Sequence, residues 1–245
     1  MTMSTGQRWI IFVVILTFVA LQCKEKSLDD TLVSKPPIIK NDNEITPEIP
    51  AETKPEKKDP KKNIPPKWAE ITQDSTGIII DLKYATKDNF TKQKIYECGR
   101  CFLRPEAAES LIAIQKDLNE RYGFGLKLFD CYRPRPAQQR LWDIVPDPNY
   151  VTPPAKGSMH SKGLAVDLTI VDKDGRELNM GTAYDFFGEE AHHDYEGFSA
   201  EIQKNRVLIR KVMELHGYNA IRTEWWHYSM TKKSYPLADW EWPCD

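Results

Sequence analysis

Hydrophobic and polar positions along this chain alternate between strand-like and helix-like periods. Residues 77–85 (GIIIDLKYA) form a β-branched run after a polar stretch, which predicts a strand. Apolar residues recur at helical spacing over 105–122 and stop at Gly123, which predicts an amphipathic helix. Residues 126–133 (LKLFDCYR) then alternate with a period of two, which predicts a strand that carries Arg133 at its end.

A short helix and another strand follow in the pattern. Pro134 and Pro136 precede the segment AQQRLWDI, and proline is favoured at the first position of a helix. After a proline-rich loop, apolar residues alternate with small or polar ones over 164–169 (LAVDLT), which predicts a strand. In this strand Asp167 lies on the face opposite the leucines.

The C-terminal part completes a mixed set of elements. Ser199 is a suitable N-cap for a helix over 199–216, which Gly217 ends. The segment TEWWHYSM, residues 223–230, predicts a last strand. Regular β-α-β alternation is absent, so we predict an α+β domain with a small, mostly antiparallel sheet flanked by helices.

The N-terminal quarter has a different character. Residues 9–21 (WIIFVVILTFVAL) are too short for a comfortable membrane span but have the length of a signal-peptide core. Cys23 stands where a bacterial lipoprotein would be cleaved and acylated, although Gln22 replaces the small residue that usually precedes it. Residues 24–67 are dominated by Lys, Glu, Asp and Pro, so they cannot bury enough surface to offset their ordering entropy.

These patterns divide the chain into an export segment (1–23), a disordered tether (24–67) and one domain (68–245). We expect an exported protein, either periplasmic or anchored as a lipoprotein that faces the periplasm or cell surface, and an uncleaved anchor would leave it on the same side. The net charge of −2 and the scattered basic residues argue against a nucleic-acid partner. Membrane contact is expected only through the N-terminal anchor, and nothing in the sequence indicates an oligomeric state.

Four cysteines lie in the predicted domain, an even number that is compatible with two disulfides in an exported protein. The pairing cannot be deduced from the sequence. Cys98 and Cys101 also have the C-x-x-C spacing of zinc and redox sites, but a zinc site of this type needs a second such pair. Disulfides or buried free thiols are therefore favoured for Cys98, Cys101, Cys131 and Cys244.

Two histidines and an aspartate could form a metal site, because a catalytic zinc typically has three protein ligands and an open fourth position. His160, Asp167 and His227 supply suitable donors. Glu224 is the candidate general base for the water that such a metal activates. Residues three apart on an ideal strand face opposite ways, so Glu224 and His227 can share one site only if a turn or bulge intervenes. Arg133 could stabilise an oxyanion, since its guanidinium stays charged and presents several donors.

Each of these residues taken alone has a more common structural role. A single histidine is more often a structural residue than a ligand, and Arg133 alone is more often a surface charge or an ion-pair partner. Glu224, beside two tryptophans, could be a carboxylate at the rim of an aromatic cluster. The segment 192–194 (HHD) could also bind metal, but adjacent side chains splay apart, which favours a solvated loop. His216 precedes the glycine that ends a helix, where a histidine interacts favourably with the helix dipole.

The segments SMHSKGLAVDL and EWWHY, with CYRP upstream and MGTAYDFF between them, together resemble the zinc D-alanyl-D-alanine dipeptidases. These are the vancomycin-resistance type within the wider D,D-peptidase and hedgehog-like group. The resemblance covers essentially the whole domain, from DLKYATKDNF at 81–90 onward. It implies one Zn²⁺ per domain on His160, Asp167 and His227, with Glu224 as catalytic base and Arg133 as transition-state stabiliser.

The resemblance also implies a small closed pocket for a dipeptide with a free amine. Asp185 matches the position of the ammonium partner, and Ser158 and Tyr84 match further substrate contacts.

The implied function is that of a zinc metallopeptidase that hydrolyses D-Ala-D-Ala or similar D,D-dipeptides with a metal-activated water. Family members that counter vancomycin are cytoplasmic, whereas this chain carries an export signal, which favours cell-wall turnover or salvage over resistance. One alternative is a D,D-carboxypeptidase or endopeptidase that acts on peptidoglycan peptides. Another is a non-catalytic zinc module that binds cell-wall fragments, but such a module would need neither Glu224 nor Arg133.

Overall fold

The computed structural model describes residue 65 and residues 67–244. The predicted export segment (1–23) lies outside the described residues, as does all of the predicted tether (24–67) apart from residues 65 and 67, so both remain predictions. Within the described part, no helix is long and apolar enough to cross a membrane.

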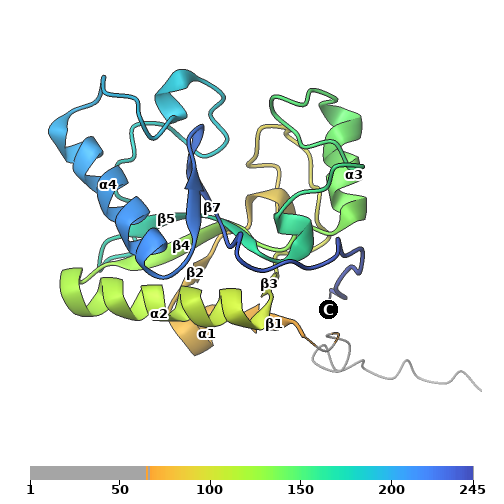
Figure 1. Cartoon of the computed structure of the whole chain (residues 1–245), viewed down its shortest axis with the longest axis horizontal. Helices are drawn as coiled ribbons and strands as arrows, with labels where there is room; N and C mark the ends of the chain where they lie inside the picture. The colour runs from red at the N-terminus through yellow and green to blue at the C-terminus, as the bar shows by residue number, and fades with distance from the viewer. Residues whose placement is uncertain (1–64, 66, 245) are drawn as a thin grey trace, which may run out of the picture. The chain divides into compact units, whose positions relative to one another are not determined.

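A five-stranded sheet in the order β2-β4-β5-β7-β6 forms the centre of the molecule (Figure 1). Only the pairing of β2 with β4 is parallel, and the other neighbours are antiparallel. A separate two-stranded sheet pairs β1 with β3 in antiparallel fashion. The predicted small, mostly antiparallel sheet is therefore confirmed. The strands are β1 Ala69–Ile71, β2 Ile79–Ile80, β3 Cys101–Leu103, β4 Gly125–Asp130, β5 Ala165–Val171, β6 Asn219–Ile221 and β7 Glu224–Ser229.

The helices surround this sheet, which confirms the α+β class. Helices α2 and α4 contact each other; α2 also contacts β4, and α4 contacts β6 and β7. Helix α3 lies on the other side of β7 from α4 (Figure 1). The α-helices are α1 Gln73–Thr76, α2 Pro105–Tyr122, α3 Arg135–Ile144 and α4 Ala200–Leu215, and short 3₁₀ turns span Lys83–Ala85, His160–Lys162 and Glu189–Ala191.

The predicted helix boundaries agree with those observed. Gly123 ends α2 with a positive φ of 68°, a conformation that glycine adopts without the strain of a side chain. Ser199 occupies the predicted N-cap position of α4, but its side chain makes no capping hydrogen bond. Gly217 follows α4 with a φ of 87°.

The core lies between α2, α4 and the sheet. Every residue of β5 is buried, with apolar Val166, Leu168 and Ile170 in the main apolar cluster. Asp167 alternates with these residues, as the sequence pattern predicts, and so projects from the opposite side of the strand. A second cluster is largely aromatic and includes Tyr84 and Trp242.

Two predicted strands are shorter than expected. In 77–85 only Ile79–Ile80 forms a strand, because the chain then turns to bury Tyr84 in the aromatic cluster. The strand predicted over 126–133 ends at Asp130, after a register shift against β5. The Asp130 carboxylate accepts a hydrogen bond from the Cys131 amide at 2.9 Å, which replaces a ladder partner at this point.

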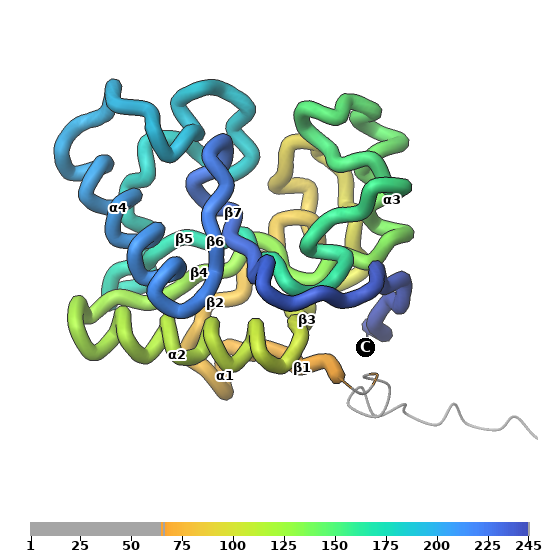
Figure 2. Tube along the Cα trace, in the orientation of Figure 1, coloured from red at the N-terminus to blue at the C-terminus, as the bar shows by residue number. Residues whose placement is uncertain are grey.

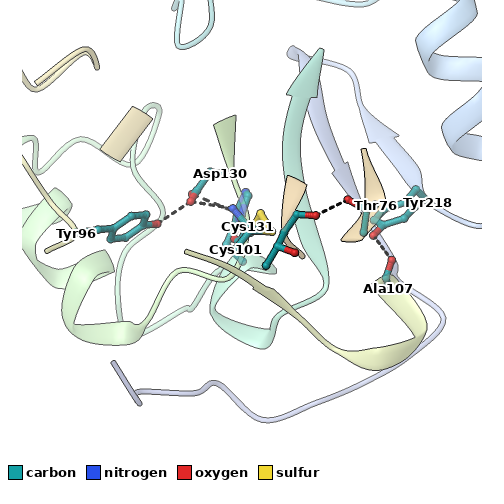
Figure 3. Close-up of a disulfide and its surroundings, with 9 residues drawn as sticks. Thr76, Tyr96, Cys101, Ala107, Asp130, Cys131 and Tyr218 are labelled. Carbon is teal, nitrogen blue, oxygen red and sulfur yellow. Dashed lines mark hydrogen bonds and ion pairs between the residues drawn. A yellow bond between two sulfur atoms is a disulfide. The ribbon is translucent and has the colours of Figure 1, made fainter. Parts of the chain in front are cut away.

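Both cysteines of the C-x-x-C segment form disulfides with distant partners. Cys98 pairs with Cys244, and Cys101 pairs with Cys131, whose surroundings Figure 3 shows. The first bond joins the C-terminal segment to the domain; after β7 this segment runs from the sheet toward α3 (Figure 2). There the Arg135 amide donates to the Ala238 carbonyl at 3.0 Å.

His193 differs from the solvated loop residue that the sequence predicts. It is half-buried, and its buried Nε2 makes no hydrogen bond within the described residues. Burial, together with the charges of Arg210 and Arg206, lowers the pKa of His193 to about 4. Neighbouring Asp194, in contrast, is exposed and forms an ion pair with Arg222.

The lowered pKa of His193 predicts that the stability of the protein depends on pH. The folded pKa of His193 lies below the unfolded value of about 6.5, so the unfolded chain takes up a proton first, and stability falls as the pH drops from about 6.5 toward 4. Between pH 7 and pH 5, the wild type should lose roughly 1–2 kcal/mol more unfolding free energy than His193→Gln. Urea unfolding at both pH values measures the difference, and equal losses would contradict the prediction.

Candidate metal and catalytic site

Three separate elements bring the predicted metal ligands together. His160 begins the 3₁₀ turn His160–Lys162, Asp167 lies on β5, and His227 lies on β7. Asp167 and His227 are direct partners in the antiparallel β5–β7 ladder, so their side chains lie on the same face of the sheet. One ligand atom from each of the three residues lies within 4.8 Å of the other two.

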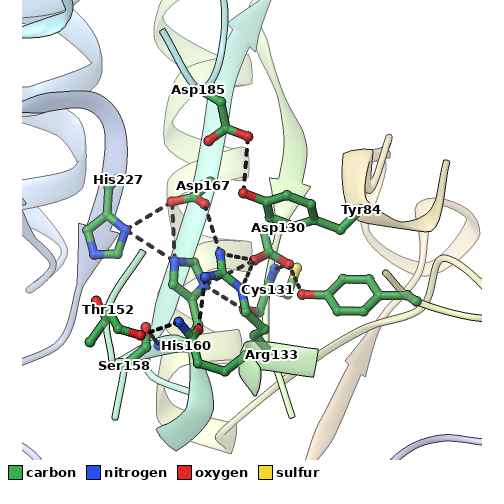
Figure 4. A network of polar contacts seen from close by, with 12 residues as sticks. Tyr84, Asp130, Cys131, Arg133, Thr152, Ser158, His160, Asp167, Asp185 and His227 are labelled. Carbon is green, nitrogen blue, oxygen red and sulfur yellow. Dashed lines mark hydrogen bonds and ion pairs between the residues drawn. The ribbon is translucent and has the colours of Figure 1, made fainter. Parts of the chain in front are cut away.

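The spacing of the donor atoms fits a tetrahedral metal. His160 Nε2 lies 3.1 Å from His227 Nδ1 and 3.3 Å from Asp167 Oδ1, and His227 Nδ1 lies 3.0 Å from Asp167 Oδ1 (Figure 4). Bonds of about 2.0–2.1 Å to a tetrahedral Zn²⁺ place neighbouring ligand atoms about 3.3 Å apart. The two imidazoles and the carboxylate therefore fit such an ion in both chemistry and separation.

Neighbouring groups orient these ligands. His160 donates its Nδ1 proton to the Cys131 carbonyl at 2.7 Å, which leaves the Nε2 lone pair directed at the cluster. Tyr184 donates its hydroxyl proton to Asp167 Oδ2 at 3.0 Å, which leaves Oδ1 for a metal. Burial alone would raise the pKa of Asp167, but His160 and His227 hold it well below its usual range, so the carboxyl is ionised.

An irregular pairing of β7 lets Glu224 face the same cavity as His227. Ala220 of β6 pairs with Tyr228, but the next residue, Ile221, pairs with Glu224. One step along β6 thus corresponds to four residues of β7, so the regular strand pairing is interrupted between Glu224 and His227. Such an irregularity is needed for both side chains to reach one cavity. Burial raises the pKa of the half-buried Glu224 above its ordinary value.

Arg133 lies just beyond the end of β4, held by a buried carboxylate. Its Nε and Nη2 donate to Asp130 Oδ2 at 3.0 and 2.6 Å, and its Nη1 donates to Gln138 Oε1 at 3.1 Å. Burial alone would lower the pKa of Arg133, but Asp130 and the neighbouring tyrosines together more than offset this effect, so the pKa is raised and the guanidinium stays ionised. Since a guanidinium has five N–H groups, donors remain that can face the cavity.

Asp185 forms another acidic wall of the cavity. It has a positive φ of 57°, which aspartate tolerates better than most residues, and it accepts the Tyr84 hydroxyl proton at 3.0 Å. Burial, and next the charge of Asp167, raise the pKa of Asp185 well above its ordinary value.

All the predicted site residues line one cavity of about 240 Å³. This is below the range of about 300–1,000 Å³ that is usual for pockets of drug-sized ligands, so the cavity suits a small molecule. The eight residues are Tyr84, Arg133, Ser158, His160, Asp167, Asp185, Glu224 and His227.

The sequence of this domain matches the model of the peptidase family described as D-ala-D-ala dipeptidase over residues 65–243. The chain belongs to this family. It is 39% identical over 166 residues to the D-alanyl-D-alanine dipeptidase of Escherichia coli (strain K12), which covers 67% of this chain and 86% of that relative. It is 37% identical over 191 residues to the D-alanyl-D-alanine dipeptidase of Enterococcus faecium, in a match that covers 68% of this chain and 93% of that relative. The protein is therefore an enzyme, a metallopeptidase.

Similarity to solved structures is weaker. The structure of the LdcB LD-carboxypeptidase superposes with a TM-score of 0.38 at 18% identity over 68% of either chain, which is too low to bear on function.

Several residues of this dipeptidase-family site were not found from the sequence. Asp130 and Tyr184 hold Arg133 and Asp167, and both stand beside residues of the motifs, in DCYRP and in MGTAYDFF. Tyr150 and Phe187 also line the cavity, with ring centres 4.5 Å apart at its exposed rim. No periodicity distinguishes these two loop aromatics from others. His216, by contrast, lies at the end of α4 beside Asp117, away from the cavity.

The hydrogen bond from Tyr184 predicts an effect on metal affinity. Tyr184→Phe removes the hydroxyl that orients Asp167, so divalent-metal affinity should fall roughly 10-fold, as is typical when a partner of a metal ligand is lost. Competition with a chromophoric chelator measures the affinity. Tyr195→Phe is the control, because its hydroxyl makes no hydrogen bond within the described residues. Equal affinities for the two variants would refute the orienting role.

Proposed function

We propose that the protein hydrolyses D-alanyl-D-alanine to two D-alanines, with one Zn²⁺ held by His160, Asp167 and His227. The observation that carries the proposal is that a metal-ligand triad, a carboxylate and a guanidinium line one cavity of about 240 Å³. Membership of the dipeptidase family supports the substrate class.

Zinc suits the donor set, since imidazole nitrogens and a carboxylate oxygen at tetrahedral spacing are common zinc ligands. When bound, the ion would act as a Lewis acid that polarises a carbonyl group and acidifies water. Three protein ligands leave room for substrate at a fourth position, which is typical of catalytic rather than structural sites.

Glu224 moves the protons in this proposal. Its carboxylate takes a proton from the attacking water and returns it to the leaving amine nitrogen. Burial raises the pKa of this carboxyl. A pKa nearer to the working pH suits both steps, because the group can then take up and release a proton more readily.

Arg133 stabilises the charge that develops on the carbonyl oxygen. Its fixed guanidinium is already oriented by Asp130 and Gln138, so little reorganisation is needed as the oxyanion forms. This interaction strengthens in the transition state, and it therefore contributes to turnover rather than to ground-state binding.

Asp185 provides the means to recognise a free amine. Burial raises the pKa of its carboxyl, and a substrate ammonium would supply a positive charge that favours the ionised form. Tyr84 fixes the Asp185 carboxyl by its 3.0 Å hydrogen bond, and Ser158 lines the same cavity. A dipeptide satisfies this requirement, whereas a longer wall peptide has no amine at that position.

We also propose that the enzyme acts outside the cytoplasm, on dipeptides released by cell-wall turnover. The predicted export segment and Cys23 support this location. The disulfides Cys98–Cys244 and Cys101–Cys131 also support it, since such bonds persist in oxidising compartments.

The role of Glu224 predicts a separation of turnover from metal binding. Glu224→Ala should reduce kcat for D-Ala-D-Ala by at least about 10²-fold, because the proton transfer loses its base. Zinc content should stay unchanged, because Glu224 is not a ligand. Assay of released D-alanine together with elemental analysis tests both statements, and substantial remaining activity would remove Glu224 from the mechanism.

The role of Asp185 predicts the substrate selectivity. Wild-type enzyme should cleave D-Ala-D-Ala but not its N-acetylated form, and Asp185→Asn should lower kcat/KM for the free dipeptide at least about 10-fold, since an ammonium loses its charged partner. Side-by-side assays of the two substrates measure this. Efficient cleavage of the blocked dipeptide by the wild type would instead assign a D,D-carboxypeptidase.

A further inference from the structure

The Cys101–Cys131 disulfide is linked to a proposed metal ligand, because the Cys131 carbonyl accepts the Nδ1 proton of His160. We infer that it is a positioning element of the metal centre, because it fixes the carbonyl group that orients His160. The inference rests on the proposed metal site, and it assigns to this disulfide a role beyond stabilising the fold.

The orientation of His160 depends on one hydrogen bond. Its Nδ1 donates to the Cys131 carbonyl at 2.7 Å, while the nearest carboxylate oxygen, Asp130 Oδ2, lies 3.7 Å away (Figure 4). With the proton on Nδ1, the Nε2 lone pair faces His227 and Asp167. If the carbonyl moved, the ring could adopt the other tautomer or rotate, and the ligand would be lost.

The sheet does not hold this carbonyl in place. Strand β4 ends at Asp130, one residue before Cys131, and its register against β5 has already shifted. The Cys131 amide bonds to the Asp130 side chain rather than to a neighbouring strand. The segment 131–133 therefore depends on contacts from outside the main sheet.

Strand β3 and Arg104 after it provide those contacts, both to the segment that carries the acceptor Cys131 and to the turn that carries the donor His160. Cys101 forms the disulfide to Cys131 (Figure 3), and the Phe102 carbonyl accepts the Tyr132 amide at 3.0 Å. Just after β3, Arg104 donates from its amide to the Gly163 carbonyl at 2.9 Å and from Nε to the Lys162 carbonyl at 3.0 Å. Strand β3 and the residue that follows it thus contact both the turn that carries His160 and the segment whose carbonyl accepts the His160 proton.

The disulfide is the covalent part of this brace. Both of its cysteines are buried, at 1% and 0% exposure, and it links the two-stranded sheet to the end of β4 in the main sheet. Arg133 lies two residues beyond Cys131, and its amide donates to the His160 carbonyl at 3.2 Å. Loss of the disulfide is therefore expected to disturb both the proposed metal ligand His160 and the guanidinium of Arg133.

The second disulfide is a matched control. Cys98–Cys244 joins the C-terminal segment to the domain, and that segment is also held by the Trp242 indole, which donates to the Cys98 carbonyl at 3.1 Å. The loop that it closes spans 146 residues, against 30 for Cys101–Cys131. Loop-closure entropy predicts that removing the longer link costs more stability.

The test compares the full chain with the double variants Cys101→Ala/Cys131→Ala and Cys98→Ala/Cys244→Ala. We expect the zinc Kd to rise at least about 10-fold in the first variant and to change by less than about 3-fold in the second, although the second should have the larger loss of Tm. A purely structural role predicts that the loss of zinc affinity follows the loss of Tm, and that result would overturn the inference. Equal zinc affinity in all three proteins would overturn this inference but leave the proposed function intact. A wild type that binds no zinc would overturn both.

A measurement on the wild type covers the case in which the first variant does not fold. The ¹⁵N chemical shifts of His160 in the metal-free protein should show the tautomer with the proton on Nδ1. A proton on Nε2 would overturn the inference, because the Cys131 carbonyl would then not control the ring.

Discussion

The compensation of buried carboxylates governs how this site is built. Carboxylates cannot be buried without compensation, since an unpaired buried charge costs several kcal/mol. Asp130 is fully buried and pairs with Arg133. Asp167 is also buried, and its nearest partners are two histidines and a tyrosine, with the Arg133 guanidinium 3.9 Å away. Asp185 is half-buried and accepts a hydrogen bond from the Tyr84 hydroxyl. Arg133 thus compensates the charge of Asp130, and in the proposed function a metal ion would pair with Asp167 and a substrate amine with Asp185.

The fold places these charges with few elements. Strand β5 lies in the middle of the sheet and carries Asp167 away from the apolar core, while β7 brings His227 opposite it. The irregular pairing of β7 then adds Glu224 to the same cavity. Arg133 and His160 lie outside the strands: Arg133 follows β4, and His160 precedes β5. Strand β3 and Arg104 after it hold both residues in place, through the segment 131–133 and through the turn that carries His160. Precise placement of loop residues therefore depends on covalent and hydrogen-bonded links outside the main sheet.

The sequence was sufficient for the class of fold, the long helices and the residues that meet in the cavity. These depend on local periodicity, glycine stops and motifs whose order is specific. It was insufficient for the end of β4, because the side chain of Asp130 competes with the ladder for the Cys131 amide. Nor could it show the disulfide pairing or the roles of Asp130 and Tyr184, because these depend on contacts between residues far apart along the chain or on which way a loop turns. The contact between the Tyr84 and Tyr184 rings, whose centres lie 6.2 Å apart, illustrates this, because both rings pack in or against the aromatic cluster.

We propose above that the enzyme hydrolyses D-Ala-D-Ala through zinc held by His160, Asp167 and His227. One purified sample should be assayed for its rate of D-alanine release and for its zinc content. Both quantities are measured before chelation, after chelation and after zinc is restored. We expect one zinc per chain, loss of hydrolysis when the metal is removed and recovery when zinc is restored. Unchanged hydrolysis by metal-free protein, or a zinc-loaded protein that leaves the dipeptide intact, would contradict it.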